Sequence, residues 1–263
     1  MTSTDLTKLQ NLVQVVQNLT SRVEGERVSI AFLGYTDLML NPGEWRAMVG
    51  ERTDRLVNRP NWQKLTGIHG RPDVETVPTI SSMLDALLER PVDLTVFDFT
   101  KYEGSEVEHD FNFPVPEDHR DRYDVVIDFG TCEHIFNLAQ ALVNVHAMLR
   151  LGGRVYHCGP LCWPNHGFYG YNPTLFADFY EDNGCEIENM ILSAQANVGG
   201  KREIISIDHI PKYDRFRLAD VFQGDVRLLQ LEYNLSVIAR KVAEVEGITY
   251  PIQRKYRDSS TWI

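Results

Sequence analysis

The sequence lacks an apolar run long enough to cross a membrane, and its first residues lack the basic-then-apolar pattern of a secretory signal. Basic residues are also scarce, because 26 Lys and Arg stand against 37 Asp and Glu and leave a formal net charge of -11. Such an excess of negative charge disfavours binding to nucleic acid or to an anionic membrane surface. We therefore expect a cytoplasmic protein with neither nucleic acid nor membrane as a partner.

Cysteine is scarce as well, and the four in the chain are Cys132, Cys158, Cys162 and Cys185. None belongs to a Cys-x-x-Cys pair, and His157 and Cys158 are neighbours on a predicted strand, so their side chains point to opposite faces. A zinc site made from these thiols and from imidazoles such as His134 and His166 is therefore disfavoured. We expect free thiols and no metal, and a zinc-dependent hydrolase is kept only as the third alternative.

Short apolar runs that end on glycine or aspartate are what the sequence does contain. They suit strands buried on both faces of a parallel sheet, and stretches of helical periodicity alternate with them. The predicted strands are residues 28–34, 94–99, 107–111, 124–130, 154–159, 185–192 and 231–241. The predicted helices are residues 6–23, 43–55, 81–90, 135–150 and 173–183, and residues 60–78 are predicted to be loop because Gly, Pro and Asn crowd there.

This alternation predicts an α/β fold, with residues 1–27 as an N-terminal helical extension and residues 28–263 as a single α/β domain. In such sheets a ligand binds at the carboxyl ends of the strands. The predicted strand ends fall at residues 34–35, 98–99, 110, 128–130 and 157–160, where polar or turn-forming residues occur. The sequence therefore places a candidate site at this edge of the sheet.

Three segments resemble a known family. The segment YDVVIDFGTCEHIFNLAQALVNVHAMLRLGGRVYH, residues 123–157, is similar to the central part of class I S-adenosylmethionine-dependent methyltransferases. There, a strand ending in acid-x-Gly leads to Glu-His, a helix and a Gly-Gly turn. DFTKYEGSEVEHDFN, residues 98–112, and NHGFYGYNPTLF, residues 165–176, resemble further pieces of one subgroup. The resemblance implies a Rossmann-like sheet with helices on both faces, transferase activity and S-adenosylmethionine as cofactor.

The resemblance also implies which residues bind the donor. Asp98, at the end of the second predicted strand, would accept hydrogen bonds from both ribose hydroxyls. Asp110 would meet the adenine amino group, and Phe99 or Phe111 would offer a ring to the adenine. The residues that would line the floor under the reactive methyl group are Asp128, Phe129 and Gly130.

The first motif departs from the family pattern. It reads AFLGYTDLML, with one glycine where the family usually has several, and Gly34, Tyr35, Thr36 and Asp37 would contact the methionine half of the donor. The donor carries no phosphates, so it does not need a glycine-rich amide nest, and Thr36 and Asp37 can bind its carboxylate and ammonium through side chains. The missing glycines also support the alternative of a catalytically inactive methyltransferase-like protein that serves in binding or assembly.

His134 and Glu133 are the predicted catalytic residues. An imidazole with a pKa near its ordinary value of about 6.5 can take a proton from an acceptor hydroxyl or amine as the methyl group moves. The alternative is that the Glu-His pair caps the following helix and orients a loop. The sequence leaves both interpretations open.

A loop rich in aromatic and polar side chains follows the fifth predicted strand and suggests the acceptor site. Its members would suit a small polar acceptor with several hydroxyls, such as a sugar. The residues concerned are Asn165, His166, Phe168, Tyr169, Tyr171 and Asn172. The alternative is an ordinary turn packed on the edge of the sheet. We therefore expect methyl transfer to an oxygen or nitrogen of such an acceptor, and the sequence leaves a homo-oligomer open.

Overall fold

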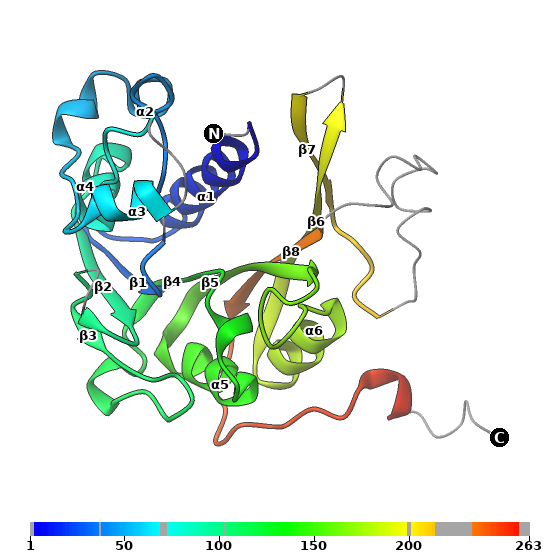
Figure 1. Ribbon diagram of the computed structural model, residues 1–263. Helices are drawn as coiled ribbons and strands as arrows, with labels where there is room; N and C mark the ends of the chain where they lie inside the picture. Colours follow the sequence, from blue (N-terminus) through cyan, green and yellow to red (C-terminus); the bar gives the residue numbers. More distant parts are fainter. Residues whose placement is uncertain are drawn as a thin grey trace. The chain divides into compact units, whose positions relative to one another are not determined.

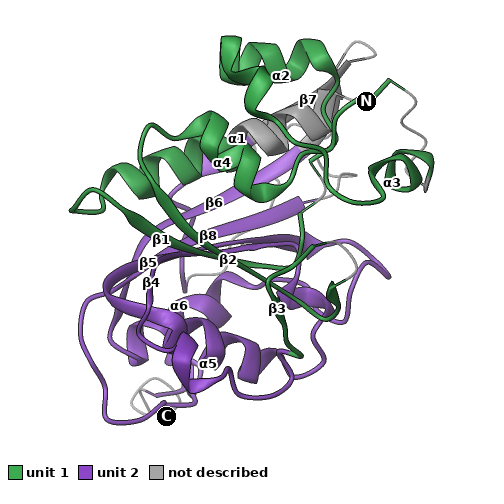
Figure 2. Cartoon of the chain, turned by 90° about the vertical axis from the view of Figure 1, so that its left-hand side faces the viewer, with its two compact units in different colours: residues 1–110, 197–204 green, residues 111–196, 205–263 purple. Residues whose placement is uncertain are grey.

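The computed structural model describes residues 3–36, 38–68, 73–101, 104–198, 201–213 and 233–257 (Figure 1). The chain divides into two compact units, one of residues 1–110 and 197–204 and the other of residues 111–196 and 205–263 (Figure 2). The predicted boundary at residue 27 stays a prediction. Among the described residues, no helix combines the length and the apolar character needed to cross a membrane.

The first unit contains three parallel strands in the order β3-β2-β1. They are β1 (Val28–Leu33), β2 (Val92–Asp98) and β3 (Val107–Glu108), and the helices are α1 (Ser3–Ser21), α2 (Pro42–Val49), α3 (Trp62–Ile68) and α4 (Ile80–Leu87). Val28 lies opposite Val92 and Leu33 lies opposite Phe97 in the register of β1 and β2. The apolar run of β1 is buried almost throughout, as expected for an inner parallel strand.

Hydrogen bonds fix α1 beside the end of α4 within the first unit (Figure 2). Gln17 donates from Nε2 to the carbonyl of Leu87 at 3.3 Å, and the Arg90 guanidinium donates to the carbonyls of Thr20 and Val23 at 3.0 Å each. The Arg90 bonds reach carbonyls at and just after the end of α1, and the Gln17 bond reaches the last carbonyl of α4. The leading helix is thus part of the packing of this unit.

The second unit contains strands in the order β4-β5-β8-β6. They are β4 (Tyr123–Phe129), β5 (Leu149–Cys162), β8 (Tyr233–Lys241) and β6 (Cys185–Val198). β4 and β5 are parallel, whereas β8 is antiparallel to both β5 and β6. Helix α5 (Leu138–Met148) packs against β4 and β5, and α6 (Pro173–Asp182) packs against β8.

The predicted Rossmann-like α/β class is confirmed. Among the described strands, the first unit has a parallel set of order 3-2-1 and the second unit has the parallel pair 4-5, and each is an order found in half of a doubly wound sheet. Short parallel strands joined through helices are what the alternating apolar runs predicted. The strand that intervenes between β5 and β6 is antiparallel, which the apolar pattern of residues 231–241 did not reveal.

Several elements differ from the prediction, among them β3, which ends at Glu108 instead of residue 111, and β5, which begins at Leu149 instead of residue 154. Residues 62–68 form α3 inside the predicted loop, because Leu65 packs in a small core with Met39, Val74 and Val77. Helix α5 begins at Leu138 instead of residue 135, because Asn137 is its N-cap, and a separate turn of 3₁₀ helix at Cys132–His134 precedes it. The strand β7 (Lys201–Asp208) was not predicted, since its polar sequence lacks an apolar run.

Asn144, on α5, fixes the segment that leads into β4. Its Oδ1 accepts from the backbone N–H of Val115 at 2.9 Å, and its Nδ2 donates to the carbonyls of Phe111 at 3.2 Å and Phe113 at 2.8 Å. The side chain is 1% exposed. It therefore supplies hydrogen bonds to three backbone groups that would otherwise lose them in a buried setting.

We expect Asn144→Ala to lower the free energy of unfolding by roughly 3 kcal/mol, because it leaves several buried polar groups without partners. Urea denaturation followed by circular dichroism measures the loss. The matched control is Asn189→Ala, which removes one hydrogen bond of 3.2 Å to the exposed N–H of His209 and should cost about 0.5 kcal/mol. Equal losses in the two variants would contradict this role of Asn144.

Candidate functional site

The carboxyl end of β2 presents Asp98, the residue predicted to bind the ribose. The side chain is half-buried, and its Oδ2 accepts from the backbone N–H of Tyr35 at 3.0 Å. Among the described residues of the first unit, the Asp98 side chain makes only this hydrogen bond. Its other oxygen, Oδ1, has no hydrogen-bond partner among them. Oδ2 thus holds the carboxylate in place, and Oδ1 remains available to a ligand.

Gly34 makes the turn that brings the chain from β1 to Asp98. Its φ of +73° lies in the left-handed region, which favours glycine, and its N–H donates to the carbonyl of Phe97 at 2.7 Å. The next N–H, that of Tyr35, is the one that binds Asp98. A single glycine is therefore enough for this turn, although the family pattern has several.

The side chain of Tyr35 packs inside the first unit. The Arg59 guanidinium lies 5.0 Å from the centre of its ring, and its hydroxyl accepts from the N–H of Ile80 at 3.2 Å, at the start of α4. What Tyr35 offers to the site is thus the backbone N–H bound to Asp98. Thr36 is half-buried beside it, whereas Asp37 lies outside the described residues.

The aromatic residues predicted for the adenine differ in exposure. The Phe99 side chain is 69% exposed directly after Asp98, whereas Phe111 is 4% exposed. Asp110 is half-buried, and it precedes the segment that Asn144 holds. An exposed phenylalanine beside a carboxylate can offer a face to a flat ring, which the buried Phe111 cannot do without movement.

Asp128, at the carboxyl end of β4, is the centre of a buried hydrogen-bond network in the second unit. Its Oδ1 accepts from the N–H groups of Thr131 and Cys132 at 3.1 Å each, and its Oδ2 accepts from His157 Nδ1 at 2.7 Å and the Tyr171 hydroxyl at 2.8 Å. Burial raises the pKa of Asp128, but the bonds from His157 and Tyr171 outweigh it and leave the pKa below its ordinary value. Both oxygens are therefore used inside the protein.

The network continues through His157 to Tyr180. His157 lies opposite Asp128 in the register of β4 and β5, and its Nε2 is 2.6 Å from the Tyr180 hydroxyl on α6. An Nδ1–H donated to the carboxylate leaves Nε2 as the acceptor of the tyrosine proton. Sequence reasoning considered His157 as a metal ligand and as part of the strand end at residues 157–160, but it missed Tyr180. The shared register with Asp128 is the signal that could have identified the pair.

Glu133, the first of the two predicted catalytic residues, is 1% exposed in the turn after β4. Its Oε2 accepts from the Tyr171 hydroxyl at 3.2 Å, and its buried Oε1 has no hydrogen-bond partner among the described residues. Burial raises the pKa of Glu133 to about 8, with a further contribution from the negative charge of Asp128. The carboxyl group is thus poised to hold a proton near neutral pH.

Two imidazoles lie at the orphaned oxygen of Glu133. Nε2 of His166 is 3.5 Å from Oε1, Nε2 of His134 is 4.0 Å from it, and the two rings have their centres 5.1 Å apart. The side chains are 48% exposed in His134 and 37% exposed in His166. The structure thus brings together both predicted catalytic residues and one residue predicted to bind the acceptor.

The capping alternative for the Glu-His pair is not what the structure shows. Asn137 occupies the N-cap of α5, and its side chain accepts from the N–H of Gln140 at 3.3 Å. Glu133 and His134 instead belong to the short 3₁₀ turn before that cap. Glu133 and His134 therefore do not cap α5, whereas the part of the alternative in which the pair orients a loop stays open.

The loop of residues 165–172 is fastened to the turn that carries Glu133. The N–H of Phe168 donates to the carbonyl of Glu133 at 2.8 Å, and a Cβ on Gly167 would lie 2.8 Å from that same carbonyl oxygen. Only glycine fits this close approach. The two segments that carry His134 and His166 are therefore held in contact by backbone as well as by side chains.

Residues of this loop divide between the interior and the surface. Tyr171 is fully buried over Gly159, where a Cβ would lie 2.5 Å from its ring, while Phe168 and Tyr169 are 64% and 38% exposed. Asn172 caps α6 by accepting from the N–H of Thr174 at 3.0 Å, and Asn165 is exposed with a φ of +61°. Tyr171 and Asn172 thus have structural partners, whereas the other members face outward.

Three exposed aromatic side chains pack together on the two segments that carry His134 and His166. Phe136 is 70% exposed and meets Phe168 edge to face at 5.6 Å, and the Tyr169 hydroxyl donates to the carbonyl of Phe136 at 2.8 Å. We refer to Phe136, Phe168 and Tyr169 as the aromatic rim. Sequence reasoning missed Phe136, although it stands two residues after His134 just as Phe168 stands two after His166. Phe129 is half-buried and Gly130 is exposed next to this turn.

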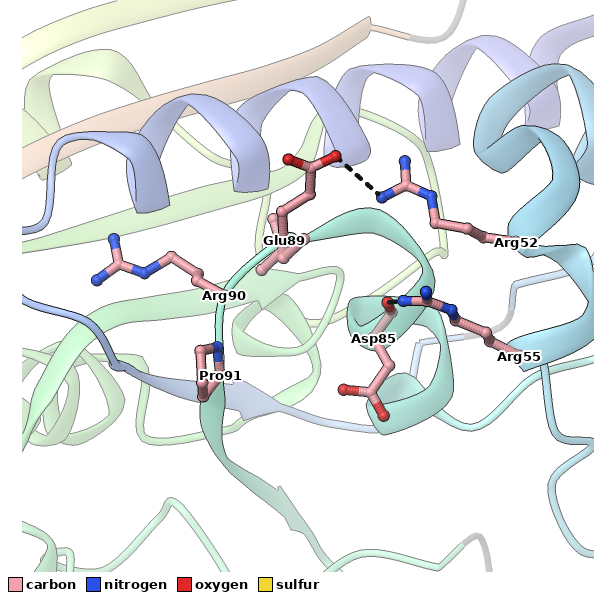
Figure 3. Close-up of a pocket in the computed structure, with 7 residues that line it drawn as sticks. Arg52, Arg55, Asp85, Glu89, Arg90 and Pro91 are labelled. Carbon is pink, nitrogen blue, oxygen red and sulfur yellow. Dashed lines mark hydrogen bonds and ion pairs between the residues drawn. The ribbon is translucent and has the colours of Figure 1, made fainter.

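A cavity of about 700 Å³ lies in the first unit, away from Asp98 (Figure 3). Its arginines are already engaged: Arg52 pairs with Glu89 at 3.8 Å, Arg55 donates to the carbonyl of Asp85 at 3.2 Å, and Arg90 binds the end of α1. The cavity borders the residues that lead into the amino end of β2. It is therefore at the opposite end of that strand from Asp98, and we do not place the site there.

No protein-family profile matches the sequence, and no curated protein matches it. Solved structures that resemble the chain include a SAM dependent methyltransferase from Archaeoglobus fulgidus, at 12% identity and a TM-score of 0.45, covering 88% of this chain and 94% of that one. The CMeT domain of the citrinin polyketide synthase is 11% identical with a TM-score of 0.44, covering 90% of this chain and 52% of that one.

The CurJ carbon methyltransferase resembles the chain at 11% identity and a TM-score of 0.47, covering 88% of this chain and 53% of that one. This chain therefore spans about half the length of the CurJ and citrinin chains. Identities at this level assign neither a substrate nor a reaction. The function proposed below depends on the side chains of this chain.

The raised pKa of Glu133 predicts how stability changes with pH. Its folded value of about 8 lies above the ordinary value of 4.5, so its contribution is complete below pH 4.5 and is lost as the pH rises through 8. Glu133→Gln removes this dependence. Relative to the wild type, we expect the variant to gain about 2 kcal/mol of unfolding free energy between pH 6 and pH 8.

Urea denaturation at several pH values in metal-free buffer measures this difference. Glu186→Gln is the matched control, because Glu186 is exposed on β6 and should give the same pH profile as the wild type. Parallel profiles for the wild type and Glu133→Gln would show that Glu133 is ionised in the folded protein throughout this range.

Proposed function

We propose that this protein is an S-adenosylmethionine-dependent methyltransferase that acts on an oxygen or nitrogen of a small polar acceptor. The single observation that carries the proposal is the state of Asp98, which is fixed by the N–H of Tyr35 through Oδ2 and presents Oδ1. A ribose offers two neighbouring hydroxyl donors, and a carboxylate at a strand end accepts such donors well.

The residues around Asp98 suit the other parts of the donor. Gly34 has the positive φ that a tight turn after β1 requires, and Phe99 is exposed beside the carboxylate. The sulfonium, when bound, supplies an electrophilic methyl group, so the protein need not activate it further. What this chain must do is orient the donor and exclude competing nucleophiles.

We assign the acceptor side to the second unit. In the transfer, the acceptor atom forms a bond to the methyl carbon as the bond of that carbon to sulfur breaks, and the acceptor's proton has to leave. His134 is 48% exposed next to the buried carboxyl of Glu133 and can receive this proton. Glu133 then acts as a positioning residue for the imidazole.

The aromatic rim supports a small acceptor with both polar and apolar surfaces. Exposed rings at Phe136 and Phe168 offer apolar contact, while His166 and Asn165 offer polar groups from the same loop. A sugar combines hydroxyls with an apolar ring face and is the finer form of the proposal. Amines and hydroxylated aromatic compounds share part of this chemistry and belong in the same assay.

The donor titration tests the first half of the proposal. We expect calorimetry to show binding of S-adenosylmethionine and S-adenosylhomocysteine to the wild type, and Asp98→Ala to weaken it at least about tenfold by removing the carboxylate that accepts from the ribose. Asp93→Ala is the matched control, since Asp93 is exposed at the other end of β2.

The absence of both a heat of binding and a thermal shift at millimolar ligand would reject donor binding. The protein would then be better described as a methyltransferase-like binding or assembly partner without catalysis, as the scarce glycines of the first motif suggest. Equal affinities of Asp98→Ala and Asp93→Ala for the donor would instead show that the protein binds the donor and that Asp98 is not part of the binding site.

Methyl transfer from labelled donor to a panel of sugars, amines and hydroxylated aromatics tests the second half. On any acceptor that is turned over, His134→Ala should leave donor binding nearly intact and lower turnover by about 10² to 10⁴, as expected for loss of a general base. His209→Ala, at an exposed histidine remote from Glu133 in sequence, is the control. Undiminished turnover in His134→Ala would exclude the base.

A further inference from the structure

Three side chains of the second unit converge on a small space beside β4. They are the carboxylate of Glu133 and the imidazoles of His134 and His166, with one ligand atom of each within 4.8 Å of the others. Glu133 and His134 come from the 3₁₀ turn after β4, and His166 comes from the loop after β5. Two imidazoles and one carboxylate are a common ligand set for divalent transition metals.

The buried oxygen of Glu133 is the feature that points to a ligand. Glu133 is 1% exposed, its Oε1 has no hydrogen-bond partner among the described residues, and that oxygen lies 3.5 Å from His166 Nε2 and 4.0 Å from His134 Nε2. A buried polar atom without a partner is costly and uncommon, and an ion is one of the ordinary explanations. A cation between the three atoms would satisfy this oxygen.

The distances suit a metal after a small contraction. With metal–ligand bonds of about 2.0–2.1 Å and tetrahedral angles, neighbouring ligand atoms are about 3.4 Å apart. Glu133 is the rigid member, because Tyr171 holds its Oε2 and Phe168 holds its carbonyl. The two histidines are partly exposed, so their rings are the members that can move to close the site. His166 is supported by the Trp163 ring at 4.8 Å.

The second unit contains another cluster of possible metal ligands, but its polar atoms already have hydrogen-bond partners. Asp128, Cys132 and His157 also lie within 4.8 Å of one another and are buried. However, both oxygens of Asp128 accept hydrogen bonds, and both ring nitrogens of His157 are engaged, one with Asp128 and one with Tyr180. A metal there would have to break these bonds. At Glu133 it would break none that involve Oε1.

We propose that Glu133, His134 and His166 bind a divalent transition-metal cation such as Mn²⁺, Co²⁺ or Zn²⁺. Imidazole nitrogens favour these ions over Mg²⁺ and Ca²⁺, which prefer oxygen ligands. Three protein ligands leave at least one coordination position open, and the exposure of both histidines indicates that this position faces the surface.

The open position identifies the acceptor more narrowly, and this step rests on the function proposed above. A hydroxyl oxygen bound to the cation loses its proton to solvent more easily than a free hydroxyl. The cation thus replaces His134 as the group that promotes loss of the acceptor's proton, and His134 becomes a ligand of the cation. The acceptor is then a hydroxylated compound that coordinates the metal through oxygen and lays an apolar face on Phe136 or Phe168.

The test is a metal titration of the full chain without any donor or acceptor. After treatment with a chelator and its removal, we expect Co²⁺ to bind at one ion per chain, with visible absorption bands of a nitrogen- and oxygen-ligated site, and Zn²⁺ to displace it. His166→Ala and His134→Ala should each weaken binding at least about tenfold. His209→Ala, which alters an exposed histidine outside the cluster, should bind as the wild type does.

Glu133→Gln is the second probe, because it keeps the shape of the side chain and the hydrogen bond from Tyr171 but offers a much weaker ligand. Thermal melting shows whether each variant is folded. Metal binding that needs all three residues supports the proposal. Absence of stoichiometric Co²⁺ binding, or binding that survives both histidine substitutions, overturns it.

Failure of this inference can be told apart from failure of the proposed function. If the donor binds and the metal does not, His134 remains available as the free base of a metal-independent transferase. If the metal binds and the donor does not, the cluster is a metal site in a protein with another activity. Turnover that is lost with chelator and restored by Mn²⁺ or Zn²⁺ would support both together.

Discussion

The hydrogen bonds to Asp128 are the interaction on which the second unit's site depends. This one buried carboxylate accepts from the turn after β4, from His157 on β5 and from Tyr171 in the loop beyond. An unpaired carboxylate could not be buried there, and four donors make its charged form favourable. The position of Glu133 follows, because Tyr171 also donates to it and because the turn that carries it begins at N–H groups bound by Asp128.

Two neighbouring carboxyl groups thus have opposite properties. Asp128 is stabilised as an anion by its donors, whereas Glu133 receives one hydrogen bond, is just as buried and feels the charge of Asp128, so its pKa rises. Asp128 binds the turn and the loop through hydrogen bonds, whereas Oε1 of Glu133 has no hydrogen-bond partner among the described residues and lies near the exposed histidines. Asp128, which has a structural role, is thus only five residues before Glu133, which has a raised pKa.

Much of the fold could be predicted from the sequence, because inner parallel strands are continuous apolar runs and β1, β2 and β4 are of this kind. The Glu-His pair and the loop of residues 165–172 could be found through a resemblance, but their partners could not. Tyr180 reaches His157 from α6, 23 residues away, and no local pattern marks that contact. Likewise, β7 has a polar sequence, and α3 depends on a small core assembled from residues 39–77.

Gly159 lies beneath the ring of Tyr171, with no room for even one methyl group. A side chain at position 159 would expel that ring and so remove a donor from both buried carboxyl groups. Loss of the tyrosine alone would leave a hollow above the glycine. We therefore expect positions 159 and 171 to change together in evolution. A homologue with another residue at one of them should also have another residue at the other.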